Sequence, residues 1–413
     1  MKRPFLLLYV LTAVLGLVLS ACSGTSAEPA SQTTATRKPT ATFLPDPTAT
    51  PAPYMQVDLA ELRGTQITFL HGWSGKRANE TAALVDQFNQ TNEWGIFVIV
   101  DAPGSHRLAY QKLLQTGGDT PAPALAATRS DDLRAWQASS QKLVDISGYS
   151  SLPQIGLPLT SSADFYPALL AETREGDFQF GLPAAGNLHL LIYNQGWARE
   201  LGFAGSPVSF TDFRQQVCAA AQASTDGVGG WLVSTSPETA LAWLASLGAE
   251  QVFDGSAFTF NTDGAQKAFL DLSALFSQGC AWNGRALTPY DYFAARQTLA
   301  YSGTLLDLLP QAQVNKVFAA ADTWTALPYP GEGSSAVLAD GDAYAVLEST
   351  PEQQMAAWLF IRWMSQPGMQ ARLAAADGSL PPGKQALQEM GKFGSENPQW
   401  LDAVRLAEDA LSA

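Results

Sequence analysis

Apolar residues along the chain follow two spacings, and the pattern switches repeatedly between that of a strand and that of a helix. Short, nearly continuous apolar runs at 66–70, 96–100 and 188–193 predict buried strands. Apolar residues three or four positions apart, the spacing of a helix, occur at 79–89, 108–115, 196–201, about 237–248, 262–278 and 351–376. A further helix is expected to open at 210–213, with Thr211 as its N-cap. This alternation predicts an α/β sheet with crossover helices.

The N-terminus carries a different pattern, that of an export signal. Two basic residues precede an almost wholly apolar run at 5–19, which is shorter than the roughly 20 residues that a membrane-spanning helix needs. The run ends in the sequence LSAC, which resembles a bacterial lipobox. The resemblance implies a signal peptide at 1–21 and lipidation of Cys22 with palmitate; the alternative is an ordinary signal peptide followed by an incidental cysteine. We therefore expect an extracytoplasmic protein, anchored to the cell membrane at the cell surface or in the periplasm.

The segment after the cysteine has the composition of a linker. Residues 25–53 are dominated by Thr, Pro and Ala, and their large apolar residues are Phe43 and Leu44. Such a segment cannot bury enough apolar surface to fold, and its prolines bias it toward extended polyproline II. At about 3.1 Å per residue, about 30 residues reach roughly 90 Å at most. We interpret 22–62 as a tether that holds a globular body away from a membrane.

Composition limits the chemistry of this body. The chain has 24 Lys and Arg against 38 Asp and Glu, a formal charge of −14 that becomes −16 when the two basic residues of the signal are lost. Such an acidic chain is a poor partner for nucleic acid. With three Cys and three His, we expect no Cys/His metal site and no cofactor. The glycine-rich stretch 227–230 lacks the lysine of a nucleotide-binding loop, and neither HExxH nor G-x-S-x-G occurs.

Short motifs follow one another along the expected body in a definite order. They are HGWSG at 71–75, FN at 88–89, FGLP at 180–183, LIYN at 191–194, FTDF at 210–213, FAARQTLA at 293–300, LPYPG at 327–331, AAWLFI at 356–361 and GSLP at 378–381. This ordered set, from about Thr65 to the C-terminus, resembles the family 1 extracellular solute-binding proteins, the lipoprotein receptors of ABC sugar importers. Departures are Pro123-Ala124 where the family often has Pro-Asp, Arg296 in place of a usual Gly, and Leu306.

The resemblance implies an α/β, two-lobed periplasmic-binding-protein-like fold of type II, in which chain crossings form a hinge. The first lobe would hold 63–182 plus 345–379, and the second 183–344 plus 380–413. The crossings would lie near 182–187, 341–347 and 380–384. The resemblance further implies a monomer without catalytic activity, which captures a sugar or oligosaccharide and passes it to the permease subunits of an ABC importer in the membrane.

A sugar offers hydroxyl groups on its edges and C–H patches on its faces, so its site combines aromatic surface with polar side chains. Ligands of open α/β sheets bind beyond the carboxyl ends of strands, and the family commonly contacts its ligand at the crossings. On these grounds the candidate ligand-binding residues are His71, Trp73, Ser74, Thr128, Asp131, Asn187, Trp231, Glu238, Tyr301, Ser302, Asp342 and Tyr344.

Several candidates also have a structural interpretation that the sequence leaves open. Trp73 can pack under its own loop instead of lining a cleft. Asn187 can cap a turn, and Glu238 can complement the dipole at the start of a helix. Leu306 stands about where several family members carry a ligand-stacking Trp. For this reason the resemblance does not indicate which sugar binds.

Two cysteines, Cys218 and Cys280, both fall in the expected second lobe. Outside the cytoplasm such a pair is expected to form a disulfide, which would close a loop of about 60 residues. The alternative is a pair of buried free thiols.

Other functions remain open at this stage. Within the receptor interpretation, the ligand can be a non-sugar solute such as glycerol phosphate or a polyamine. A surface glycoside hydrolase is a further alternative because carboxylates are plentiful, although no pair of them stands out. A lipoprotein with a structural or adhesive role is the third.

Overall fold

The computed structural model describes residues 57–116, 122–157, 163–224, 228–249, 252, 258–284, 288–408 and 411. The expected signal peptide, the lipidation site Cys22 and the tether up to residue 56 lie outside the described residues. A 3-10 helix, η2 (Leu59–Leu62), places Leu62 fully buried in a hydrophobic cluster. The folded body thus begins inside the segment interpreted as tether. In the described part of the chain, no helix is both long enough and apolar enough to span a membrane.

Three strands lie at the apolar runs 66–70, 96–100 and 188–193, the last of them beginning earlier than expected, at Leu182, and the other strands, among them the nine-residue β13, were not indicated by those runs. The strands are β1 (Gln66–His71), β2 (Phe97–Asp101), β3 (Leu125–Arg129), β4 (Arg174–Glu175), β5 (Phe178–Gln179), β6 (Leu182–Asn194), β7 (Gly229–Leu232), β8 (Ala281–Trp282), β9 (Thr298–Thr304), β10 (Trp324–Leu327), β11 (Tyr329–Pro330), β12 (Ser335–Ala336) and β13 (Leu338–Val346). Within the described residues, one nine-stranded sheet has the order β2-β1-β3-β13-β6-β9-β7-β8, with β10 paired to β6. Pairing is parallel among β1–β3 and among β7–β9, whereas β6 and β13 run antiparallel to their neighbours.

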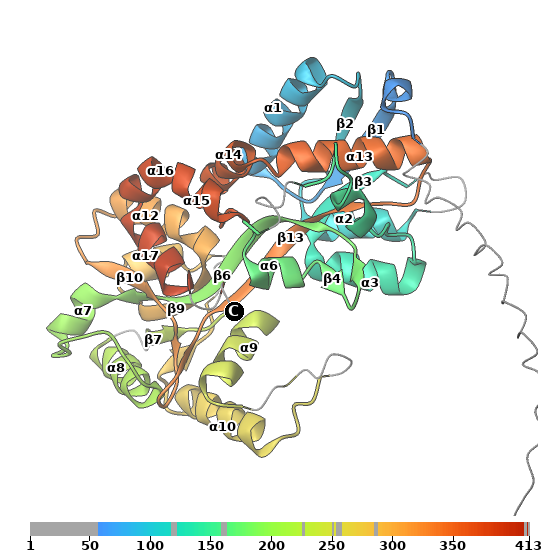
Figure 1. Cartoon of the computed structure of the whole chain (residues 1–413). Helices are drawn as coiled ribbons and strands as arrows, with labels where there is room; N and C mark the ends of the chain where they lie inside the picture. The colour runs from blue at the N-terminus through green and yellow to red at the C-terminus, as the bar shows by residue number, and fades with distance from the viewer. Residues whose placement is uncertain are drawn as a thin grey trace, which may run out of the picture. The chain divides into compact units, whose positions relative to one another are not determined.

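Strands β6 and β13 join the two parallel parts of this sheet and run side by side (Figure 1). The first part of β6 pairs with β13, from Leu182 opposite Tyr344 to His189 opposite Leu338, and its last part pairs with β9. Gly186 of β6 also exchanges two backbone hydrogen bonds of 2.8 Å with Leu380. The three expected crossings therefore meet at one place. The limits assigned to the two lobes stay a prediction.

Helices cover the sheet, and several of them lie where the spacing of apolar residues predicted a helix. They are α1 (Gly75–Thr91), α2 (His106–Leu114), α3 (Ser130–Ser140), α4 (Ser147–Ser150), α6 (Pro167–Ala171), α7 (Gln195–Glu200), α8 (Phe210–Ala223), α9 (Pro237–Ser246), α10 (Asp263–Ser277), α11 (Tyr290–Ala294), η3 (Leu305–Asp307), α12 (Leu308–Val317), α13 (Pro351–Met364), α14 (Pro367–Asp377), α15 (Lys384–Glu389), α16 (Gly391–Glu396) and α17 (Pro398–Leu406).

Two helix predictions need correction. The single helix expected at 351–376 is two helices, α13 and α14. Pro367 cannot continue α13 and instead occupies the first turn of α14. The N-cap of α8 is Ser209, whose side chain accepts a hydrogen bond from the backbone N–H of Asp212 in a capping box. Thr211, the expected cap, lies two residues too late, and its hydroxyl donates to Glu332 instead.

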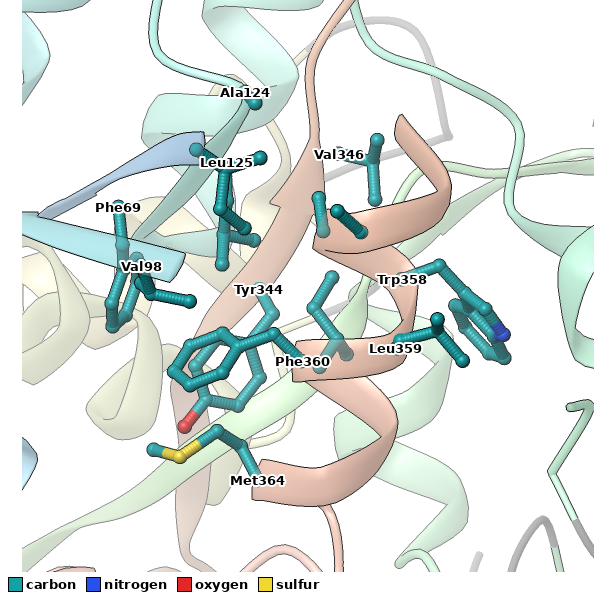
Figure 2. Close-up of a cluster of buried hydrophobic side chains, with 14 of the residues drawn as sticks. Phe69, Val98, Ala124, Leu125, Tyr344, Val346, Trp358, Leu359, Phe360 and Met364 are labelled. Carbon is teal, nitrogen blue, oxygen red and sulfur yellow. The ribbon is translucent and has the colours of Figure 1, made fainter. Parts of the chain in front are cut away.

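A first hydrophobic cluster packs α13 against the β1–β3 part of the sheet. The helix is apolar on most sides, so it is buried rather than amphipathic, and Trp358 and Phe360 are both fully buried. The ring of Phe360 lies 5.5 Å from that of Phe69, centroid to centroid, and Trp358 leaves the helix on its other side (Figure 2). The Trp358 indole N–H donates to the backbone carbonyl of Ile155, which satisfies its one polar atom.

Two further clusters form the core around β7–β10. One gathers residues from β6, β9 and α17 with η3, and the other packs α8 and α9 on β7. Tyr166 and Leu169, at the start and inside of α6, belong to the first of these two. Helix α6 therefore contributes to the core of the second lobe, although its residues fall in the range assigned to the first. A separate first core and second core is what a two-lobed body requires.

Cys218 and Cys280 form a disulfide in the structure, with their Cα atoms 4.5 Å apart. The bridge ties α8 to the end of α10 and joins residues 62 positions apart in the sequence. Cys280 is 3% exposed and packs in the cluster beneath these helices.

Candidate functional site

A cavity of about 180 Å³ lies where the three crossings meet, and we call it the hinge cleft. The parallel strands β1 and β3 present their carboxyl ends to this edge of the sheet, where ligands of α/β sheets bind. The pairing of β13 with β6 shifts in register there, between Asp342 and Ala343. The lining residues are Trp73, His106, Arg129, Ala185, Gly186, Asn187, Leu306, Asp340, Gly341, Asp342, Asp377 and Ser379. Of the twelve candidates from the sequence, Trp73, Asn187 and Asp342 line the cleft.

Two glycines let the hinge strands approach each other at the cleft. Gly341 of β13 lies directly opposite Gly186 of β6. A Cβ atom on Gly341 would collide with the backbone carbonyl oxygen of Ala185, and one on Gly186 would come within 2.7 Å of the Leu169 side chain. Neither glycine has a positive φ. Gly341 is therefore required for the close approach of two backbones, whereas a Cβ on Gly186 would meet leucine side chains, and neither position needs an unusual backbone conformation.

Trp73 lines the cleft with its edge and packs with its ring. The indole N–H donates a 2.6 Å hydrogen bond to Oδ2 of Asp342. The His71 ring stacks on the indole at 5.2 Å between centroids, and the Arg77 guanidinium lies 4.4 Å from the indole centroid. Because the residue is only 3% exposed, neither face of the ring is left open for a sugar. Both interpretations of Trp73 are therefore partly right: it packs under its loop, and from there it orients Asp342.

His71 and Tyr344 lie beneath Trp73 and do not line the cleft. His71 is completely buried, and desolvation together with the nearby Arg77 charge lowers its pKa to about 4, so the imidazole is neutral at physiological pH. Tyr344 meets the Trp73 ring edge-on at 5.9 Å, and burial raises the pKa of its hydroxyl. Both residues support the indole from within the first core.

The floor of the cleft is formed by the alternating residues of β13 and their partners on β6. Asp340 lies opposite Asn187, and Asp342 opposite Ala185. Oδ2 of Asp340 is 3.3 Å from the His189 ring nitrogen Nε2 and 3.6 Å from Nη2 of Arg129. Burial opposes ionisation of Asp340, but His189, Arg129 and the Asn187 amide outweigh it and hold the pKa of this carboxyl below its usual value. Asp340, partly buried in the floor, is therefore ionised at neutral pH.

An ion pair between Arg129 and Glu238 crosses one side of the cleft. Arg129 closes β3, and Glu238 lies in the first turn of α9, so the 2.8 Å contact joins elements of the two expected lobes. Burial works against the ionised form of Glu238, but its own backbone N–H and the guanidinium together lower its pKa. Glu238 thus takes the helix-start position that the sequence left open, and acts on the cleft through Arg129.

The other candidates lie away from the hinge cleft. Ser74 is exposed at the start of α1, and the Asp131 side chain is 70% exposed beside Arg134. Trp231 is buried against Phe213 and Trp243, and its indole N–H donates to Ser302.

Tyr301 and Thr128 are also core residues. Tyr301 of β9 is completely buried, and its ring meets Phe293 edge-on. Thr128 is 1% exposed, and its hydroxyl lies 3.3 Å from Nδ1 of His106, which does line the cleft. For Thr128 the reason is strand alternation: its neighbour Arg129 lines the cleft, and adjacent side chains of β3 point to opposite faces of the sheet.

Sequence reasoning missed several lining residues, and two of them had a usable signal. Asp340 and Asp342 are separated by two positions, so on a strand they share one face. Arg129 lies between the candidates Thr128 and Asp131 and is the last residue of β3, at the strand end where ligands of α/β sheets bind. By contrast, nothing in the local sequence pointed to His106, Asp377 or Ser379, which reach the cleft only through the packing of α2 and α14.

Glu172 carries a partly buried carboxyl close to Asp340, and the pH dependence of stability tests its protonation. Burial, and then the charges of Asp340 and Asp131, raise the pKa of Glu172 from 4.5 to about 8. The folded state therefore keeps a proton that the unfolded chain releases. This contribution to stability is complete below pH 4.5 and is lost as the pH rises through 8. We expect Glu172→Gln to flatten the fall in melting temperature between pH 6.5 and 9.

The pH window is chosen to exclude His71, whose lowered pKa affects stability only below pH 6.5, in the opposite direction. The matched control is Glu175→Gln, which alters an exposed glutamate three residues further along. An unchanged pH slope in Glu172→Gln would show that this carboxyl is not the source.

Chemically, the cleft offers hydrogen bonding and charge rather than a metal centre. In the described residues no group of His, Cys, Asp and Glu is arranged to hold a metal ion. The lining contains carboxylates, an amide and a guanidinium, which are the groups that bind hydroxyls with defined geometry.

Comparison with known proteins agrees with this arrangement. Residues 83–402 match the family described as bacterial extracellular solute-binding protein. No curated protein sequence matches the chain. Among solved structures, the sugar-binding protein MalE of Xanthomonas citri has a TM-score of 0.69 at 20% identity, covering 84% of this chain and 85% of its own.

Two further structures illustrate the range of ligands on this fold. UgpB of Mycobacterium tuberculosis, solved with glycerophosphocholine, has a TM-score of 0.68 at 16% identity and covers 83% of this chain and 86% of its own. The cyclic alpha-maltosyl-1,6-maltose binding protein of Arthrobacter globiformis has a TM-score of 0.65 at 19% identity, covering 82% and 85%. At these identities the likenesses establish the two-lobed fold.

Proposed function

This chain belongs to the bacterial extracellular solute-binding protein family, and from that premise we propose that it captures a sugar or oligosaccharide between its two lobes and delivers it to an ABC importer. The observation that carries the proposal is the hinge cleft, in which three chain crossings and the strand ends of the sheet converge on partly buried polar side chains. Such a cavity between lobes can close on a ligand by bending at the crossings.

Two solved structures on this fold are named for sugar binding, MalE and the cyclic maltosyl-maltose binding protein. We take the same substrate class for this chain. The alternative with the most specific support is a glycerophosphodiester, because UgpB binds glycerophosphocholine on the same fold. A polyamine has no comparable support among these structures.

We further propose that the chain binds without turnover. A glycosidase of the usual kind needs one protonated and one ionised carboxyl facing the substrate. In the hinge cleft the floor carboxyl Asp340 has a lowered pKa, whereas Glu172 and Asp132, whose pKa values are raised, do not line the cavity. This arrangement supports binding without turnover.

The proposal extends to the parts of the chain outside the described residues. Signal cleavage, lipidation of Cys22 and a Thr/Pro-rich tether would hold a monomeric receptor at the membrane, next to the permease that receives the ligand. The lobes would have the limits expected from the sequence, 63–182 plus 345–379 and 183–344 plus 380–413, with η2 added to the first lobe because Leu62 packs in its core.

A ligand screen by thermal unfolding tests the proposal. A ligand that binds only the folded state stabilises it by about 2.7 kcal/mol when its concentration is 100 times Kd. We expect at least one sugar from a panel of mono- and oligosaccharides to raise the melting temperature of the purified protein, with no new product detected after incubation.

The same screen includes glycerol 3-phosphate, glycerophosphocholine and spermidine as competing ligand classes. A rise in melting temperature with one of these and with no sugar would replace the proposed substrate class. Release of a hydrolysed product would contradict the receptor function itself.

A further inference from the structure

We propose that the hinge cleft is built to accept hydrogen bonds from an uncharged polyhydroxy ligand at Asp340 and Asn187, and that it rejects ligands that place a phosphate there. The inference rests on the proposed receptor function and specifies which chemical class the receptor takes. Three features of the cleft support it: the buried acceptor oxygens of Asp340 and Asn187, the charges of the lining residues, and the covered ring of Trp73.

The first observation is a pair of buried acceptor oxygens without a partner. Oδ1 of Asp340 and Oδ1 of Asn187 are both inaccessible to solvent, and no group of the described chain donates to either. The two residues lie directly opposite each other on β13 and β6, so their side chains are neighbours on one face of the sheet. Buried acceptors without a donor are costly, and a bound ligand that supplies O–H groups removes that cost.

The free atoms at this point differ from one another in chemistry. Oδ1 of Asp340 and Oδ1 of Asn187 are oxygens, and each is the buried, unpartnered atom of its side chain. Oδ2 of Asp340 faces Arg129 at 3.6 Å and Nε2 of His189 at 3.3 Å, and that ring nitrogen is the third buried atom here without a hydrogen-bond partner. Both free oxygens are acceptors, so the complementary ligand group for them is a hydrogen-bond donor.

The second observation is the balance of charge around these oxygens. Among the residues that line the cleft, three carboxylates stand against one arginine and one histidine. Nη2 of Arg129 lies 2.8 Å from Glu238, 3.6 Å from Asp340 and 3.8 Å from Asp131, so its charge is already matched. A phosphate at the floor would meet like charges and would find no guanidinium free to pair with it.

The carboxylates are also compensated, which argues against a cationic ligand. Asp342 accepts from the Trp73 indole, and Asp377 lies 3.5 Å from Nη1 of Arg77. Asp340 is paired through its other oxygen. In addition, Trp73 is the one Trp, Tyr or Phe among the described residues that line the cleft. It is 3% exposed, so its ring offers no face to a quaternary ammonium. Neutral hydroxyl groups satisfy the acceptors without disturbing this balance.

The test uses probes matched in shape and different in charge. Glucose, galactose and mannose are each compared with their 6-phosphates and their 2-amino derivatives by calorimetric titration of the purified protein, and glycerophosphocholine is included. We expect a neutral sugar to bind, its phosphate to bind at least about 100-fold more weakly, and its amine to bind no more tightly than the neutral form.

Two variants connect the selectivity to the named atoms. Asp340→Asn removes the charge and keeps the shape, and should reduce the preference for the neutral sugar over its phosphate at least tenfold. Asn187→Ala removes one acceptor without a change of charge, and should weaken the neutral sugar about tenfold while the phosphate is unaffected. Asp271→Asn, a carboxylate of α10 paired with Lys267, is the control for net charge and should change neither.

Each outcome decides the matter. Equal or tighter binding of a phosphate overturns the inference and leaves the receptor function standing, as does tenfold tighter binding of an amine. Unchanged selectivity in Asp340→Asn, with a wild-type melting temperature, separates the selectivity from this residue and also overturns it. If none of these probes binds and no member of the panel of mono- and oligosaccharides raises the melting temperature, the proposed function fails and the inference fails with it.

Discussion

Replacing Arg77 with methionine is expected to lower the free energy of unfolding by about 3–5 kcal/mol, the cost of breaking a buried ion pair by removing one partner. Arg77 lies near the start of α1 and is 3% exposed. Its guanidinium donates to the backbone oxygen of Ala184 at 3.0 Å and to the Ser379 hydroxyl at 2.9 Å, and lies 3.5 Å from Asp377. One side chain thus holds two of the hinge crossings to the first lobe.

Methionine retains much of the apolar stem, so the loss would come from the charged, hydrogen-bonding head. Urea unfolding measures the effect. The matched control is Arg372→Met, which removes an arginine that is 41% exposed and pairs with Glu80 on the surface, and should cost under about 1 kcal/mol. Similar midpoints for the two variants would mean that Arg77 is not a structural centre of the hinge.

The second large effect is expected from the disulfide. Replacing both Cys218 and Cys280 with serine should lower the free energy of unfolding by about 4 kcal/mol, because the bridge closes a 62-residue separation and restricts the unfolded chain. The loss should be confined to stability, since neither cysteine lines the hinge cleft, and sugar affinity should remain within about twofold of wild type.

Reduction of the wild-type protein is the companion measurement. Alkylation of the native protein under non-reducing conditions should leave Cys218 and Cys280 unmodified, and both should gain the alkyl mass after reduction. Labelling of these two thiols without reductant would reject the bridge, and equal unfolding midpoints before and after reduction would reject its contribution to stability.

Much of the fold was predictable because helix and strand patterns are local. The apolar run at 66–70 and the helical spacing at 79–89 correspond to β1 and α1, and the order of the motifs along the chain indicated the family. Errors came where a single local residue decides an element. Pro367 divides a helix in two, and Ser209 rather than Thr211 caps α8.

The candidate site was less predictable because facing and burial depend on neighbours. Asn187 and Asp342 were expected at crossings and do line the cleft. Trp231 and Tyr301, also placed near strand ends, instead fill the second core. The sequence could not separate these cases, because all four residues lie in strands. Only the packing of the neighbouring elements decides which face of each strand is covered.

By itself, the sequence indicated the family, the α/β alternation, a disulfide between Cys218 and Cys280 as the expected state of that pair, and the polar character of the crossings. These features depend on spacing and order along the chain. Tertiary structure alone decided that both faces of Trp73 are covered, that Arg77 binds two crossings, and that Asp340 and Asn187 present free acceptors to the cleft. Each of these requires groups distant in sequence to meet, and the balance of burial and charge that results is a property of the assembled fold.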